Sequence, residues 1–188
     1  SSDLGINKPE PVEVAYFAFT DISLTESVIN RHVYGFNQRF RPSKPIEAGA
    51  SKIHGIHYSD VQNATPWEFK AIDLPQATDA DPIYLIGHNI AFDIRALSFG
   101  NDAIKANLTE IYKPICTLKI ARKAFPEIKE LGGYSLANIS SHIFSEFAAE
   151  IQKLAHGAKA DCLLTMCLID KICSEYDIKT WEELYNLQ

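Results

Sequence analysis

Blocks of apolar and polar residues divide the chain into a strand hairpin followed by alternating strands and helices. Residues 12–19 are rich in β-forming side chains and predict a strand, and residues 28–40 predict a second, longer strand. Turn-forming residues at 20–26 separate the two, so we expect an antiparallel hairpin. After the hairpin we expect a helix over 45–55 that begins at a proline, a loop over 59–67 and a helix over 67–74.

The most regular stretch begins with the four bulky residues 83–86. They have no polar interruption, which is typical of a strand covered on both faces of a parallel or mixed sheet. Gly87 ends the run, and Asn89 is the predicted N-cap of a helix over roughly 90–106.

Asp93 lies in the first turn of that helix, beside the apolar stripe Ile90, Ile94 and Leu97. A carboxylate is favoured at this positive end of a helix, and here it can face the end of the preceding strand. Ligands of open α/β sheets bind at that edge. The alternative is an acid that serves only the helix dipole.

The second half of the chain alternates in the same way. We expect a short strand over 114–116, helices over 118–125, 135–144, 157–176 and 180–187, and a loop over 145–156. A hairpin followed by alternating strands and helices indicates an α/β layer fold.

Asp161 interrupts the apolar face of the longest predicted helix. Leu164, Leu168 and Ile172 form a line, and Asp161 extends it one turn earlier. Burying an unpaired carboxylate is expensive, so a partner cation, a metal or a shifted pKa is expected there. The alternative is that Asp161 only caps the helix start.

His156 precedes Asp161 by five residues, so the two would point about 140° apart on one helix. A shared metal-binding face is therefore excluded, and Gly157 allows His156 to sit on a loop over the site. A pKa of about 6.5 would suit a general base acting on water. A structural or solvated histidine is the common alternative.

Composition describes an ordinary globule of 188 residues, with 46% apolar and 22% charged residues, and we expect one domain over residues 1–188. The four cysteines show no CxxC spacing and read as reduced thiols of a cytoplasmic protein. No apolar run approaches the ~20 residues of a membrane span.

A net charge of −6 excludes a general polyanion binder. A nucleic-acid enzyme can still be acidic if its carboxylates hold metals and a local basic patch contacts phosphates. Lys119, Arg122, Lys123 and Lys129 are the candidate patch, and a solvated helix face is the alternative.

Several short motifs occur in a fixed order. They are Pro-Val-Glu-Val-Ala (11–15), Arg-Pro-Ser-Lys-Pro-Ile (41–46), Lys-Ile-His-Gly-Ile (52–56), Gly-His-Asn-x-x-Phe-Asp (87–93), Cys-Thr-Leu-Lys-Ile-Ala-Arg (116–122), Tyr-Ser-Leu-Ala-Asn-Ile (134–139) and His-x4-Asp (156–161). Each is weak alone. The ordered set resembles the DEDDh 3′→5′ exonucleases of the RNase H-like fold, in particular the bacterial exonuclease X and proofreading types, over almost the whole chain.

The resemblance implies a mixed sheet flanked by helices and a metal-dependent release of nucleoside monophosphates from 3′ ends. Asp93 and Asp161 look like metal ligands for two Mg²⁺ or Mn²⁺ ions, and His156 like the base that activates water. His88 and Asn89 would support the site, and the loop with His54 would lie near the terminal nucleotide.

The partners implied are a 3′ end of DNA or RNA, with no membrane. A homodimer or a polymerase or repair partner is left open.

The chain departs from the family at its first motif, Asp-x-Glu on the first central strand, which is absent here. Glu13 matches a different, second-strand acid. Either the motif lies upstream of Ser1, as the lack of an initial Met and the single Met166 suggest, or catalysis has been lost. The alternative function is therefore an inactive exonuclease-like domain that binds nucleic acid or protein. An unrelated α/β domain is the third hypothesis.

Overall fold

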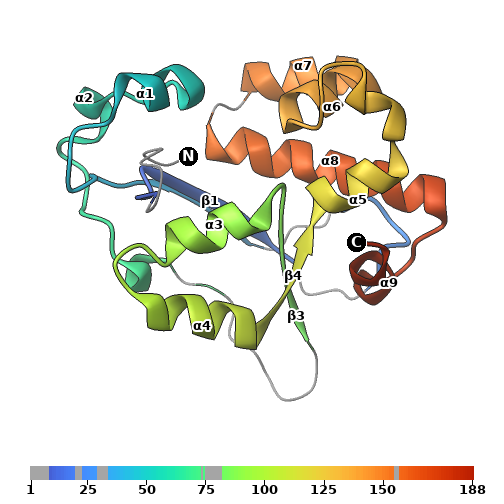
Figure 1. Cartoon of the computed structure of the whole chain (residues 1–188), viewed down its shortest axis with the longest axis horizontal. Helices are drawn as coiled ribbons and strands as arrows, with labels where there is room; N and C mark the ends of the chain where they lie inside the picture. The colour runs from blue at the N-terminus through green and yellow to red at the C-terminus, as the bar shows by residue number, and fades with distance from the viewer. Residues whose placement is uncertain (1–8, 20–22, 29–33, 73, 75–81, 155–156) are drawn as a thin grey trace.

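The computed structural model describes residues 9–19, 23–28, 34–72, 74, 82–154 and 157–188 (Figure 1). The strands are β1 (Glu13–Ala18), β2 (Tyr34–Arg39), β3 (Ile83–Gly87) and β4 (Tyr112–Cys116). The α-helices are α1 (Ala48–His54), α2 (Tyr58–Val61), α3 (Ile90–Leu97), α4 (Asp102–Ile111), α5 (Thr117–Ala124), α6 (Leu136–Ile143), α7 (Ser145–Leu154), α8 (Ala158–Tyr176) and α9 (Trp181–Leu187). The predicted α/β class is confirmed.

Strands β1 and β2 form the predicted antiparallel pair, with Glu13 opposite Arg39 and Ala18 opposite Tyr34. The rings of Tyr16 and Phe36 stack across the pair with their centroids 5.3 Å apart. The observed β2 is shorter than the predicted strand, of which residues 29–33 lie outside the described part of the chain.

Strands β3 and β4 pair in parallel, so Gly87 and Cys116 lie opposite each other at the carboxyl end. Side chains of β3 alternate between two apolar clusters: Ile83 and Leu85 pack with the cluster under α3 and α4. Tyr84 and Ile86 pack with the larger cluster on the other face. The prediction of a strand covered on both faces is confirmed. Among the described residues, this pair and the β1–β2 pair form separate two-stranded sheets.

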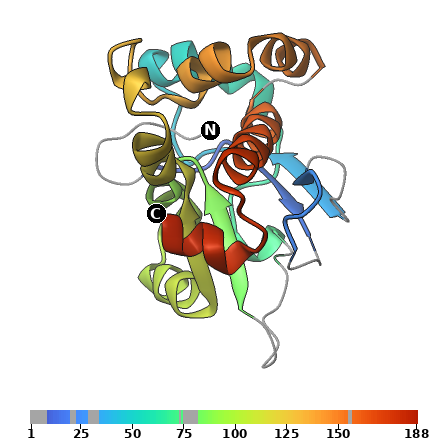
Figure 2. The same ribbon diagram turned by 90° about the vertical axis from the view of Figure 1, so that its right-hand side faces the viewer.

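The larger cluster lies between β4 and the helices α5, α6, α8 and α9, whose packing can be followed in the rotated view (Figure 2). Helix α8 also packs along β1 and so joins the two sheets. Its residues Leu168 and Ile172 are fully buried, as the apolar line predicted. All four cysteines are free thiols. In the described part of the chain, no helix has the length and hydropathy needed to cross a bilayer.

The helix predicted over 90–106 is two helices, which corrects that expectation. Helix α3 ends at Leu97, and Gly100 adopts φ +78°, a conformation that continues no helix. Helix α4 then starts afresh, because the side chain of Asn101 accepts a hydrogen bond from Ala103 N at 3.0 Å.

Three other segments were predicted to have the wrong secondary structure. The predicted loop over 145–156 contains α7, whose Ala148 and Ile151 are buried against α8. The predicted loop over 59–67 contains most of α2, which a capping box between His57 and Asp60 starts. The predicted helix over 67–74 is reduced to one 3-10 turn at Phe69–Ala71.

Truncation of Leu168 tests this packing. Leu168→Ala should lower the free energy of unfolding by about 2–5 kcal/mol, because it leaves a cavity in a fully buried cluster. Leu131→Ala is the matched control, since Leu131 is 50% exposed, and it should change stability by less than about 0.5 kcal/mol. Urea unfolding followed by circular dichroism measures both. Equal effects of the two changes would contradict the assignment of the core.

Candidate functional site

Asp93 lies at the carboxyl end of β3, in the first turn of α3. A Cβ built at Gly87 would lie 3.3 Å from Asp93 Oδ2, so the carboxylate rests against the last residue of the strand. Asn89 occupies the N-cap position in the left-handed conformation, with φ +71°, but its side chain makes no capping hydrogen bond. The strand end and the tight turn therefore fix the direction of Asp93.

Asp161 lies in the first turn of α8, on a different part of the chain. Its side chain is exposed, so the expectation that it continues the buried face is wrong: the buried line begins at Leu164. The charge of Asp161 nevertheless raises the pKa of Asp93. The fold thus brings the two acids within electrostatic range of each other.

The surroundings of Asp93 and Asp161 disfavour the ionised form of both side chains. Asp93 is exposed to solvent at its surface, but the protein around it still desolvates its carboxylate. This desolvation and, to a smaller extent, the charge of Asp161 raise the pKa of Asp93 to about 6. Desolvation and the charge of Glu13 raise the pKa of Asp161. Among the described residues, neither acid forms a salt bridge. A cation at this position would relieve the repulsion.

Glu13 anchors the helix that carries Asp161. It is only 5% exposed, and its Oε2 accepts a hydrogen bond from Ala158 N at 2.6 Å, at the start of α8. Its Oε1 accepts from Arg39 Nε at 3.1 Å, across the β1–β2 pair. Gly157 lies so close that a Cβ there would overlap Glu13 Oε2. Sequence reasoning missed this role, although an acid between Val12 and Val14 on a predicted strand was the available signal.

Cys162 lies beside the same acids. Its Sγ donates to Ala15 O at 3.3 Å, and desolvation together with the charges of Asp161, Asp93 and Glu13 raises its pKa to about 12. The thiol is therefore protonated at neutral pH, which makes it a poor nucleophile.

His88 ties the end of β3 to two other segments. Its Nε2 lies 2.8 Å from Tyr134 O, and because a carbonyl only accepts, Nε2 carries the proton. In the neutral ring, Nδ1 then accepts from Thr117 Oγ1 at 3.1 Å, at the start of α5. Desolvation lowers the pKa of His88, which favours this neutral form.

The other two predicted histidines are placed differently. His54 is the last residue of α1, where its Nδ1 accepts from Ile56 N at 3.1 Å. Its neighbour Ile53 is 73% exposed. His156 lies outside the described residues.

The carboxylates of Asp93 and Asp161 could supply some of the ligands of a hard divalent cation. The carboxylates of Asp93 and Asp161, which form no salt bridge among the described residues, are ligands that Mg²⁺ accepts, with water and substrate oxygens completing the shell. Within the described ranges, no group of three or more His, Cys, Asp or Glu residues converges as a metal site. Asp93 and Asp161 would therefore hold one ion with the help of other oxygens.

The raised pKa of Asp93 predicts how stability depends on pH. Because its pKa is higher in the folded state (about 6) than in the unfolded state (about 3.9), the folded state binds more protons between these values, and stability falls as pH rises from 4 to 6. Asp93→Asn should therefore raise the melting temperature in EDTA at pH 7.5 and have little effect at pH 4. Asp102→Asn, at an exposed acid of α4, is the control. A lower melting temperature for Asp93→Asn at pH 7.5 would contradict the conclusion that ionised Asp93 destabilises the folded state.

The close approach of Glu13 to Gly157 predicts that a side chain at position 157 is not tolerated. Gly157→Ala should destabilise the protein by about 1–3 kcal/mol, because Gly157 has φ +68° and the new Cβ would displace the Glu13 carboxylate. Gly49→Ala is the matched control: it lies inside α1 with nothing within 4 Å, and should be neutral or stabilising by up to about 1 kcal/mol. Unfolding in urea compares them, and equal effects would rule out the anchor.

Comparison with known proteins shows the family. Residues 5–169 match the model of the RNase_T exonuclease family. DNA polymerase III subunit epsilon of Buchnera aphidicola subsp. Schizaphis graminum (strain Sg) is 36% identical over 104 residues, which are 53% of this chain and 44% of that protein. The match thus spans less than half of that relative's length.

The fold agrees with that of a solved structure, exonuclease X in complex with 5′ overhanging duplex DNA. The TM-score is 0.59 at 24% identity, and the match covers 94% of this chain and 89% of the other. The predicted RNase H-like fold is confirmed. The chain belongs to the RNase_T exonuclease family, a family of nuclease hydrolases, as its DEDDh-like motifs indicated.

Proposed function

We propose that this protein is a metal-dependent 3′→5′ exonuclease that hydrolyses phosphodiester bonds at single-stranded or frayed ends and releases nucleoside monophosphates. One observation carries the proposal: the acids at the starts of α3 and α8 lie within electrostatic range, in a chain of an exonuclease family. Two raised carboxyl pKa values in an open site are typical of functional acids.

Asp93 and Asp161 would hold Mg²⁺ or Mn²⁺. A bound divalent ion supplies positive charge that stabilises the attacking and leaving oxygens of an in-line displacement. The protein contributes the fixed direction of Asp93 at Gly87 and the placement of Asp161 through Glu13. The two-ion site of the proposal would need carboxylates beyond these two.

His156 is the proposed general base. The support is its place in the sequence, directly before Gly157 and the start of α8, with Asp161 one turn into that helix. An imidazole with an ordinary pKa of about 6.5 is largely neutral at pH 7.5 and can remove a proton from water.

The remaining polar residues have proposed supporting roles. Both nitrogens of His88 are used within the protein, so we assign it the positioning of the β3 end against α5. Asn89 is exposed at the N-cap of α3, the helix that carries Asp93, and is proposed to contact substrate, as is the turn of His54 near the terminal nucleotide.

The proposed partner is the 3′ end of a nucleic acid. Support comes from the two relatives, one of which was solved with DNA and the other of which is named as a polymerase subunit. A polymerase partner is proposed on the same ground.

A non-catalytic binding domain is the second candidate. The observation that favours it is that no group of three or more His, Cys, Asp or Glu residues in the described part of the chain is arranged to hold a metal ion.

Loss of either acid should abolish turnover. With Mg²⁺, the full-length protein should shorten a 5′-labelled single strand from its 3′ end, and EDTA should stop the reaction. Asp161→Asn and Asp93→Asn should lower the rate by at least about 10³-fold, since each removes charge from the metal site. Asp102→Asn is the control and should keep wild-type activity.

Calorimetric titration with Mn²⁺ separates the two candidate functions. The exonuclease requires Mn²⁺ binding that is weakened in Asp161→Asn. Wild-type protein that binds the strand but neither binds Mn²⁺ nor cleaves would favour the non-catalytic domain.

A further inference from the structure

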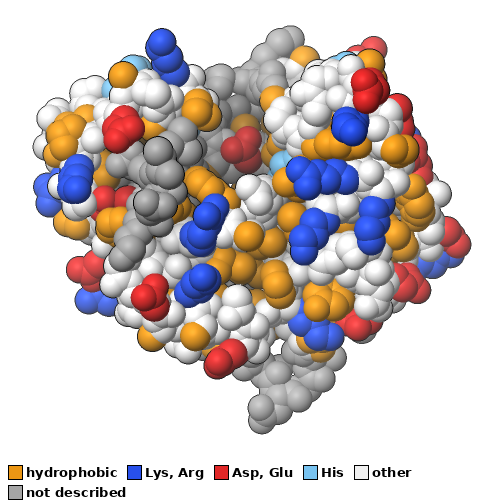
Figure 3. Space-filling model, viewed as in Figure 1, with side chains coloured by type: hydrophobic (Ala, Val, Ile, Leu, Met, Phe, Trp, Pro, Cys, Tyr) orange, Lys and Arg blue, Asp and Glu red, His pale blue; other side chains and the backbone are white. Residues whose placement is uncertain are grey.

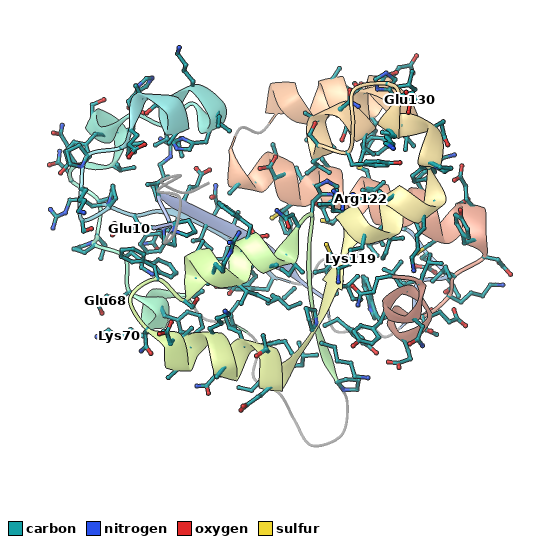
Figure 4. All side chains as sticks on the ribbon, in the orientation of Figure 1. Glu10, Glu68, Lys70, Lys119, Arg122 and Glu130 are labelled. Atoms are coloured by element: carbon teal, nitrogen blue, oxygen red, sulfur yellow. The ribbon has the colours of Figure 1, made fainter. Side chains whose placement is uncertain are left out.

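Two cations on α5 stand out because nothing acidic in the described chain neutralises them. Lys119 and Arg122 are both exposed and lie three residues apart, on one side of the helix (Figure 4). No salt bridge joins either of them to a carboxylate among the described residues. In a chain with a net charge of −6, unpaired neighbouring cations are available to an external anion.

The other members of the predicted basic cluster differ. Lys123 Nζ donates to Leu187 O at 3.1 Å and so fastens the end of α9. Lys129 stands between Glu127 and Glu130 on a short 3-10 turn, so its own segment offsets its charge. On the neighbouring strand, Lys113 pairs with Glu182 at 3.0 Å. Within the predicted cluster, Lys119 and Arg122 are therefore the two cations for which the described residues provide neither a carbonyl partner nor a flanking acid.

These two cations are placed beside the candidate site by the parallel pairing of β3 and β4. Helix α3 with Asp93 follows β3, and α5 with Lys119 follows β4, so both helices start at the same edge of the sheet. Arg122 is close enough to His88 for its charge to lower the pKa of that histidine. In the space-filling view, Lys and Arg side chains gather on the right of a central hollow (Figure 3).

Arg122 is also held in place. Its guanidinium carbon lies over the ring of Tyr134, 5.9 Å from the ring centroid, which is within the range of about 6 Å for a cation–π contact. The single proton of the Tyr134 hydroxyl is shared between Phe125 O and Pro126 O, at 3.2 and 3.1 Å, and the backbone carbonyl of Tyr134 accepts from His88. A pre-oriented guanidinium loses less entropy when it binds a phosphate.

We propose that Lys119 and Arg122 bind the phosphodiester backbone of the substrate strand, at internal phosphates on the 5′ side of the terminal nucleotide. The inference rests on the proposed function and adds the direction in which the strand leaves the site. Side chains three residues apart on a helix start about 5–6 Å apart, so two long cationic side chains reach one phosphate or two neighbouring ones. Contacts to phosphate give affinity without sequence preference.

The salt dependence of strand binding tests this proposal. Fluorescence anisotropy of a labelled 12-nucleotide single strand, with the full-length protein in Ca²⁺ to slow turnover, gives the dissociation constant between 50 and 200 mM KCl. Loss of two phosphate contacts should reduce the slope of log affinity against log salt by about 1.4. The affinity loss across this salt range should then be about sevenfold smaller for Lys119→Ala/Arg122→Ala than for wild type.

Two controls make the result specific. Lys105→Ala/Lys171→Ala removes the same charge from α4 and α8 and should keep the wild-type slope. Arg122→Lys keeps the charge and should keep the slope. An unchanged slope in the Lys119→Ala/Arg122→Ala variant, an equal change in the control pair, or no binding by wild type would overturn the proposal.

Hydrolysis of a dinucleotide, whose single phosphodiester is the scissile one, separates this inference from the proposed function. It should proceed with Mg²⁺ at the same rate in all of these variants. If dinucleotides are hydrolysed but the salt slope of the Lys119→Ala/Arg122→Ala variant is unchanged, only the proposal that Lys119 and Arg122 bind the strand is overturned. No turnover with the expected change in slope would overturn the exonuclease proposal and leave a strand-binding surface.

Discussion

The desolvation of two neighbouring acids, Asp93 and Asp161, is the constraint around which the site is built. The surrounding protein desolvates the acids at the starts of α3 and α8, and the charge of Asp161 acting on Asp93, and of Glu13 acting on Asp161, adds to the penalty of ionising them. Such an arrangement lowers stability at neutral pH unless a cation neutralises it. Proteins tolerate unfavourable groups of this kind mainly at functional sites.

Contacts far apart in the sequence maintain this arrangement. Glu13 on β1 accepts from the first amide of α8, and Gly157 is the residue that leaves room for its carboxylate. On the other side, Gly87 lets the Asp93 carboxylate approach the end of β3. His88 connects the same strand end to α5, which carries the unpaired cations. Acids and cations thus lie at one edge of the sheet, which suits a substrate that carries phosphates.

Local patterns predicted the elements whose burial repeats regularly, such as β3 and α8. They failed where distant packing decides: α7 buries Ala148 and Ile151 against α8, and the stripe through Ile90 and Ile94 hid the break at Gly100. The sequence pointed to both site acids, but it placed Asp161 on a buried face. It could not reveal that Glu13 contacts Ala158, because that hydrogen bond spans most of the chain.

The central proposal is that Asp93 and Asp161 share a divalent cation. Carbon-13 NMR of the aspartate carboxyl groups, recorded as a function of pH, tests it most directly. Without metal, Asp93 should titrate near 6, and adding Mg²⁺ should move its titration to lower pH and perturb the resonance of Asp161 as well. A titration of Asp93 near 4 that Mg²⁺ leaves unchanged would contradict the account.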